Sequence, residues 1–163
     1  MIDLRIGNGY DVHRLAEGYD LWLGGIKVEH TKGSVGHSDG DVLIHAICDA
    51  LFGALAMRDI GYHFPDTDAS FKGVDSKILL KKTIMLIRDR GYDIVNIDTV
   101  ICIQRPKIKP IIPQMRKVLA EVIGVNEDRI SVKATTTEQL GFEGREEGVS
   151  AYAVVLLSKM DKK

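Results

Sequence analysis

Apolar residues recur at helical spacing in three segments of the chain. From Asp41 to Met57 they recur every three or four positions, with further apolar residues between them, which predicts a largely buried helix. A second helix is predicted to begin with Asp75 or Ser76 as N-cap and to end before Gly91. A third is predicted from about Pro113, a residue suited to the first helical turn, to Gly124.

Four other segments have the composition of longer strands, and two short ones form a hairpin. The longer strands are predicted at Leu4–Val12, Ile94–Ile103, Ile130–Thr135 and Val149–Leu157. Gly24-Gly25, between Leu21–Leu23 and Ile26–Val28, is a two-residue hairpin signal. Interleaved strands and helices predict a layered α/β or α+β domain with a mixed sheet.

Two strand segments carry further information. Gly7-Asn8-Gly9 inside the first strand indicates a bulge or a close approach of another backbone. The segment Ile94–Ile103 alternates poorly, which predicts a strand covered on both faces.

Composition indicates one globular domain. The chain has 163 residues, of which 45% are hydrophobic, enough for a core. We predict a domain over residues 1–158 and a frayed tail over 159–163. The 22 basic and 23 acidic residues leave a net charge of -1, which argues against nucleic acid or an anionic membrane as partner.

The sequence also predicts a cytoplasmic protein with reduced thiols. No apolar run is long enough to span a bilayer, and the first residues lack the pattern of a signal peptide. Cys48 and Cys102 lie in apolar segments, as is typical of buried free cysteines.

A candidate metal site combines Asp11, His13 and His45. Asp11 and His13 are two positions apart on a predicted strand, so their side chains leave the same face. His45 lies one turn into the next predicted helix. If that helix packs on this face, zinc gains three ligands and keeps an open fourth position, which is typical of catalytic sites. The alternative is that His45 is a solvated or hydrogen-bonded histidine.

The loop Gly36–Asp41 precedes the same helix. Small residues at a helix N-terminus can hold phosphate. The alternative, capping of the helix by Ser38 or Asp39, leaves His37 without a role.

Two later segments also fit phosphate and metal. Asp59, Asp66 and Asp68 lie in one loop, suited to hydroxyl groups or a hydrated cation, or simply to an acidic surface. Three threonines and Glu138 follow a predicted strand, where they can bind phosphate and magnesium. Arg145 can bind an anion or a partner chain, or it can simply be an exposed surface arginine.

Six motifs occur in order: GNGYDVH, HSDGDVLIHA, DIGYHFPDTD, FKGVDS, PKIKPIIPQMR and KATTTEQLGFEGREEG. With them the chain, from about Arg5 to Leu157, closely resembles the 2-C-methyl-D-erythritol 2,4-cyclodiphosphate synthase family of the non-mevalonate isoprenoid pathway. The resemblance implies a two-layer α+β sandwich: a mixed four-stranded sheet with helices on one face, a small hairpin, and assembly as a homotrimer with active sites between subunits. It implies a lyase that cyclises 4-diphosphocytidyl-2-C-methyl-D-erythritol 2-phosphate and releases CMP.

The resemblance also implies roles for individual residues. Zinc is expected on Asp11, His13 and His45, magnesium or manganese on Glu138, and transition-state stabilisation by His37 and Thr136. The implied substrate-binding residues are Asp11, Val12, His13, His37, Ser38, Asp59, Ile60, Gly61, Phe64, Pro65, Asp66, Thr67, Asp68, Ile103, Gln104, Arg105, Pro106, Lys107, Ile108, Lys109, Thr135, Thr136, Thr137, Glu138, Phe142 and Arg145.

Two positions depart from the family pattern, and two other functions stay open. Ile103 stands where many members carry a small residue, beside the cytosine, and Tyr152 where some carry a glutamate facing Arg145. The same metal triad would suit a zinc-dependent phosphoester hydrolase. A non-catalytic trimer that binds a nucleotide or an isoprenoid is the other alternative. No Walker loop, GxSxG or HExxH motif is present.

Overall fold

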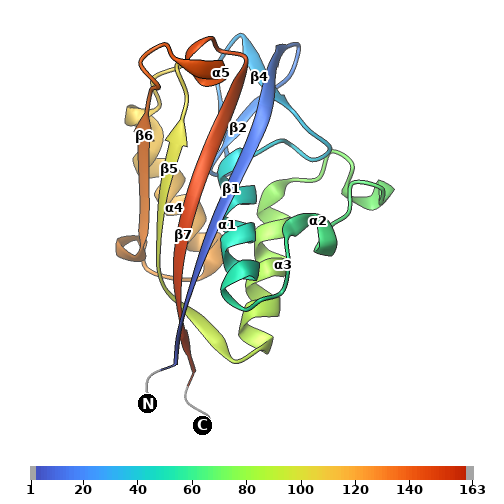
Figure 1. The fold of residues 1–163 in the computed structure, drawn as a ribbon, viewed down its shortest axis with the longest axis vertical. Coiled ribbons are helices and arrows are strands. Elements are labelled where there is room, and N and C mark those ends of the chain that lie inside the picture. The colour runs from blue at the N-terminus through green and yellow to red at the C-terminus, as the bar shows by residue number, and fades with distance from the viewer. Residues whose placement is uncertain (1–2, 161–163) are drawn as a thin grey trace.

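A mixed sheet forms one layer of the computed structural model, which describes residues 3–160 (Figure 1). The strand order is β4-β1-β7-β5-β6. β1 (Leu4–Glu17), β7 (Gly148–Lys159) and β5 (Tyr92–Cys102) pair antiparallel in turn, and β6 (Ile130–Thr135) runs parallel to β5. The predicted mixed sheet is confirmed.

The sheet has one strand more than the four predicted. β4 (Lys32–Val35) pairs antiparallel with the end of β1. Its sequence, KGSV, has four residues and only one of them is a large apolar residue, so no alternation could reveal it.

Three long helices cover one face of the sheet, which confirms the two-layer α+β fold (Figure 1). They are α1 (Val42–Ala54), α3 (Ser76–Asp89) and α4 (Ile112–Ile123). Shorter helices are α2 (Ile60–His63), α5 (Gly141–Gly144) and 3-10 turns at 69–71, 109–111 and 127–129. The predicted hairpin is formed by β2 (Leu21–Leu23) and β3 (Ile26–Val28). Within residues 3–160 no helix combines the length and the hydropathy needed to cross a membrane.

The glycines of β1 let α1 lie unusually close to the sheet. A Cβ on Gly7 would lie 1.8 Å from the carbonyl oxygen of Ala50, and one on Gly9 would lie 2.0 Å from that of Ala46. Any larger residue would therefore push α1 away from β1. Of the two interpretations of Gly7-Asn8-Gly9, the close backbone approach is the correct one, and it brings His45 near Asp11 and His13.

Within one chain the sheet is covered on one face only. Along β5, the buried Ile97, Thr99 and Ile101 alternate with the more exposed Asp98 and Val100. The prediction that this strand is covered on both faces is therefore wrong for the single chain. The bare face of the neighbouring strands exposes large apolar side chains, namely Leu4, Ile6, Tyr10, Val12, Tyr152 and Val154.

The predictions for the end of the chain and for the two cysteines had different outcomes. The predicted tail begins inside the sheet, because Lys159 is the last residue of β7 and the N–H of Met160 donates to the carbonyl of Gly91. Residues 161–163 of that tail lie outside the described part. Cys48 and Cys102 are buried and free, as predicted.

Candidate metal centre and active site

Asp11, His13 and His45 meet between β1 and α1 and are called the metal triad below. Nε2 of His13 lies 2.9 Å from Oδ2 of Asp11, and Nδ1 of His45 lies 3.1 Å from both of these atoms. Ligands about 2.0–2.1 Å from a tetrahedral zinc ion lie about 3.3 Å apart. The triangle therefore has nearly the dimensions of one face of a zinc tetrahedron, and these residues form the one His, Cys, Asp or Glu cluster of this kind within residues 3–160.

The charges of the triad favour cation binding. Burial acts to raise the pKa of Asp11, but hydrogen bonds from His13 and His45 and their charge outweigh it and lower the pKa to about 2. For His13, burial acts to lower the pKa, while the Asp11 carboxylate raises it above its ordinary value. Asp11 is thus a permanent anion that attracts either a proton on the imidazole or a metal ion in its place.

A cavity of about 350 Å³ lies beside the triad and is called the triad cavity. His13, His37, Ser38 and His45 form its polar side. The remaining lining residues are Ile60, Gly61, Phe64, Asp66, Phe71 and Leu79. The triad thus faces a space large enough for a small substrate.

Asp41 is the N-cap of α1. This fully buried carboxylate accepts hydrogen bonds from the N–H groups of Ile44, Gly24 and Gly25 at 3.1, 3.0 and 2.6 Å. Asp41 therefore caps the helix and fastens the β2–β3 hairpin to it. The alternative of a Ser38 or Asp39 cap is wrong, because Asp41 is the N-cap. The phosphate site at this loop stays a prediction.

The aspartates of the loop 59–68 have two different roles, capping of the local turns and lining of the triad cavity. Asp59 and Asp68 cap the turns that follow them by accepting from the N–H groups of Tyr62 and Ser70, both at 2.9 Å. Asp66 lines the triad cavity, whereas Pro65 and Thr67 do not. Nε2 of His37 lies 3.3 Å from the carbonyl oxygen of Asp68, which joins this loop to the one before α1.

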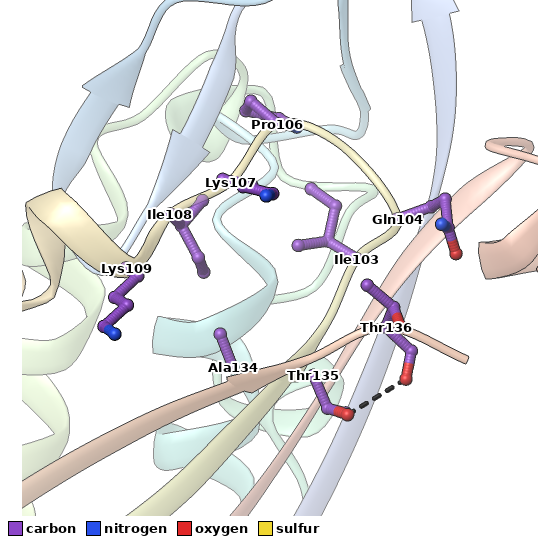
Figure 2. A pocket seen from close by; sticks show the side chains of 9 residues that line it. All are labelled: Ile103, Gln104, Pro106, Lys107, Ile108, Lys109, Ala134, Thr135 and Thr136. Carbon is purple, nitrogen blue, oxygen red and sulfur yellow. Dashed lines mark hydrogen bonds between the residues drawn. The ribbon is translucent and has the colours of Figure 1, made fainter. Parts of the chain in front are cut away.

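A second cavity, of about 160 Å³, lies where β5 and β6 end and is called the loop cavity. Figure 2 shows the loop after β5 arching over it, with the end of β6 opposite. Its lining residues are Ile103, Gln104, Pro106, Lys107, Ile108, Lys109, Ala134, Thr135 and Thr136. Arg105 is not among them, because its guanidinium pairs with Glu146.

The polar segment after β6 is exposed and strained. The hydroxyl of Thr135 donates to the carbonyl of Thr136 at 2.9 Å (Figure 2). Glu138 and the next residue, Gln139, have positive φ angles of 53° and 64°, which costs non-glycine residues about 1 kcal/mol or more each. Such strain is frequent at binding sites.

Phe142, Arg145 and Val12 lie outside both cavities. A Cβ on Gly148 would lie 2.8 Å from the ring of Phe142, so this ring packs on the start of β7. The guanidinium of Arg145 is exposed and pairs with Glu147 at 3.0 Å. Val12 alternates with Asp11 and His13 on β1, so its side chain leaves the opposite face of the sheet and is 43% exposed.

The residues predicted for the site thus fall into two groups that the single chain keeps apart. The triad lies on β1 and α1, whereas the loop cavity is formed after β5 and β6, with β7 between β1 and β5. No residue lines both cavities. Glu138 belongs to the second group and does not join the triad.

Sequence reasoning missed three polar residues beside the triad. Asp49 follows His45 by one turn and accepts from the N–H of Ile60 at 2.7 Å, which holds α2 at the cavity. The helical spacing of four was the available signal. The hydroxyl of Ser76 lies 3.0 Å from Nε2 of His45 and also contacts Asp39. Asp39 and Ser76 are 37 positions apart in the sequence, so spacing gave no indication of their contact.

A family model described as the YgbB family matches residues 4–158. The chain belongs to the YgbB family. Relatives of this YgbB-family chain include proteins named 2-C-methyl-D-erythritol 2,4-cyclodiphosphate synthase. One from Bacteroides fragilis is 64% identical over 96% of this chain and 99% of its own length. Another, from Porphyromonas gingivalis, is 65% identical over 94% of each chain.

Solved structures of this YgbB-family fold agree closely. A 2C-methyl-D-erythritol-2,4-cyclodiphosphate synthase in a CDP-bound form has a TM-score of 0.87 at 38% identity, over 94% of this chain and 99% of that one. The bifunctional IspDF of Campylobacter jejuni reaches 0.95 at 42% identity, over 99% of this chain and 44% of that longer one. IspF of Plasmodium falciparum in complex with CDP reaches 0.85 at 37% identity, with 97% of each chain covered.

Proposed function

We propose that this chain is a 2-C-methyl-D-erythritol 2,4-cyclodiphosphate synthase of the non-mevalonate route to isoprenoid precursors. It would act as a phosphorus–oxygen lyase that converts 4-diphosphocytidyl-2-C-methyl-D-erythritol 2-phosphate into the cyclic diphosphate and CMP. The observation that carries the proposal is the triangle of Asp11, His13 and His45 facing a cavity of about 350 Å³. Relatives more than 60% identical over nearly the whole chain bear this enzyme's name.

The donor set of the triad fits zinc. Two imidazoles and one carboxylate, spaced like the ligands on one face of a zinc tetrahedron, would hold the ion and would leave a ligand position for a substrate oxygen. When bound, zinc supplies a Lewis acid and a template for the terminal phosphate of the substrate diphosphate. Asp11 contributes the negative charge that holds the cation, and the carbonyl of Val35, 3.2 Å from Nδ1 of His13, orients that ring.

The reaction needs no protein base, because the substrate carries its own nucleophile. An oxygen of the 2-phosphate attacks the β-phosphorus, the bond from that phosphorus to the bridging oxygen breaks, and CMP leaves with the electron pair. The chain then has to orient two anions and neutralise their charge. We assign this task to His37 at the triad cavity and to Thr136 at the loop cavity.

The loop cavity suits the cytidine end of the substrate. Ile103 and Ile108 are buried beneath it, while Lys107 and Lys109 supply positive charge beside it. The phosphates and their magnesium or manganese ion would meet Thr135, Thr137 and Glu138. The loop 59–68, with Ile60, Gly61, Phe64 and Asp66 at the triad cavity, would hold the methylerythritol.

One substrate must reach both cavities, which lie on different elements of the chain. Because no residue lines both cavities, we propose that the loop cavity of one subunit adjoins the triad cavity of the next in a homotrimer. The exposed apolar side chains on the bare face of β1 and β7 offer a surface for this assembly. Arg105, Phe142 and Arg145, which lie outside both cavities, would act at the subunit boundary.

The test is phosphorus NMR on zinc-loaded protein with the cytidine diphosphate substrate and magnesium, alongside the His45→Ala variant. Cyclic diphosphate and CMP from the wild type, and neither from the variant, are the expected results. Linear diphosphate or free phosphate would instead indicate a zinc hydrolase. Intact substrate with the wild type would indicate a protein that only binds nucleotide.

A further inference from the structure

Two hydroxyl groups lie beside the edge of the His45 ring that points away from Asp11, that of the buried Ser76 and that of the half-buried Ser38. Nδ1 of His45 faces Asp11 and His13, while Nε2, on the opposite side of the ring, lies 3.0 Å from Oγ of Ser76 and 3.0 Å from Oγ of Ser38. Ser76 is the first residue of α3 and has no exposed surface. The ring thus stands between the metal triad and a polar contact that belongs to another helix.

Asp39 determines how the Ser76 hydroxyl is oriented. Oδ1 of Asp39 lies 2.5 Å from Oγ of Ser76, and Oδ2 accepts from the N–H of Ser76 at 2.9 Å. A carboxylate only accepts, so the Ser76 hydroxyl donates its single proton to Asp39. Oγ of Ser76 can then only accept from His45, which requires a proton on Nε2. In the metal-free chain Nδ1 also donates to Asp11, and with Nε2 held protonated it is Nδ1 that gives up its proton and offers a lone pair when a metal binds.

We propose that Ser76 and Asp39 are positioning residues that select the tautomer of His45 in which Nδ1 binds the metal. The proposal rests on the metal centre put forward above. Neither residue touches the metal position; both act through the imidazole, as the outer partners of metal-bound histidines commonly do. His13 obtains the same control from the Val35 carbonyl, whereas His45 depends on side chains from two separate segments.

The arrangement also joins the loop before α1 to the start of α3. Besides the two bonds between Asp39 and Ser76, the N–H of Asp39 donates to the carbonyl of Val74 at 3.1 Å. Ser76 has one direct contact with His45, through its hydroxyl, and its other polar contacts are with Asp39 and Ser38 of the same loop. This permits a sharp comparison with a second buried hydroxyl of α3, that of Thr83, which donates to the Leu79 carbonyl two turns further on.

The experiment measures zinc affinity by competition with a chromophoric chelator, for wild type, Ser76→Ala, Ser76→Thr and Thr83→Val. Ser76→Ala is expected to bind zinc about 10–100-fold more weakly. The visible spectrum of its cobalt-loaded form is expected to change as well. Ser76→Thr keeps the hydroxyl and is expected to recover most of the affinity, while Thr83→Val is expected to bind zinc like the wild type.

Equal zinc affinity of Ser76→Ala and wild type would overturn the proposal and leave the proposed function standing. Wild-type protein that binds no zinc would overturn both. If Ser76→Ala does not fold, an NMR measurement on the wild-type protein tests the proposal instead. Two-bond proton–nitrogen correlation of the zinc-loaded, histidine-labelled protein should find the proton of His45 on Nε2, and a proton on Nδ1 would refute the assignment.

Discussion

In the metal-free protein, Asp11 controls the protonation of its neighbour His13 in the metal triad. Asp11 holds a proton on His13, because the carboxylate raises the pKa of that imidazole above its ordinary value of 6.5. In the metal-free protein this pair stabilises the fold below about pH 6.5, and the contribution is lost as the pH rises through the folded-state pKa. Zinc competes with that proton for the same nitrogen.

The stabilisation of the fold by zinc should therefore depend on pH. We expect the rise in melting temperature on adding zinc to be larger at about pH 8 than at about pH 5.5, since at the higher pH His13 less often holds a proton that zinc must displace. Differential scanning fluorimetry with and without zinc measures both values. His45→Ala serves as the control and should gain little at either pH. Equal gains at both pH values in the wild type would contradict the assignment.

The triad was predictable because each of its contacts follows a simple period. Asp11 and His13 share a strand face by the period of two, and His45 follows one turn into the next helix. The link between Asp41 and the β2–β3 hairpin was not predictable in this way, because it is made by the N–H groups of the distant Gly24 and Gly25. No local pattern contains a contact between segments so far apart in the sequence.

Among the elements, β1 and α1 form the pair on which the site depends. Gly9→Ala would place a Cβ 2.0 Å from the carbonyl oxygen of Ala46, a neighbour of His45. We expect the free energy of unfolding to fall by about 3 kcal/mol, as in severe overpacking. Zinc affinity should fall as well, because α1 must move away from β1.

The matched control is Gly53→Ala, which also adds a methyl group between α1 and β1 but from the side of the helix. A Cβ on Gly53 would find its nearest neighbour 3.8 Å away, so this change should raise the free energy of unfolding by about 0.5–1 kcal/mol. Urea unfolding measures both variants. The interpretation of close packing fails if Gly9→Ala is as stable as the wild type.

Long periodic elements were predicted well and short ones poorly. The three main helices have apolar residues at a repeating interval, and the four longer strands are long runs of strand-forming residues. Their predicted bounds lie within a few residues of the observed ones except at the end of β1. That strand continues to Glu17 because its last residues pair with β4. β4 itself is too short and too polar to be recognised, since only pairing with β1 makes it a strand.

For the whole molecule, the bare face of the sheet is the feature that a single chain leaves unexplained. Ile6 is 72% exposed and Val154 is 49% exposed, although both lie on central strands. If the proposed homotrimer forms through this face, the double variant Ile6→Glu, Val154→Glu should shift the particle from three times the 18.1 kDa chain mass toward a single chain. It should also lose activity while it still binds zinc.

Light scattering coupled to size exclusion measures this shift in mass. Met85→Glu is the control, because Met85 is a similarly exposed apolar residue at 58% but lies on α3, in the helix layer. The proposed trimer is refuted if wild type and double variant both elute as single chains. It is refuted equally if the single-chain form of the double variant retains full turnover.

The separation of the two cavities has a genetic consequence. A chain with His45→Ala lacks a metal ligand, and a chain with Ala134→Trp has its loop cavity, of about 160 Å³, filled; each variant alone should be inactive. When the two are co-expressed, every mixed particle of the proposed homotrimer would contain one boundary where an intact triad meets an intact loop cavity. About a quarter of all sites should then function in a random mixture of the two chains. Activity should therefore return when the two inactive variants are produced together, which is complementation between two alleles of one gene.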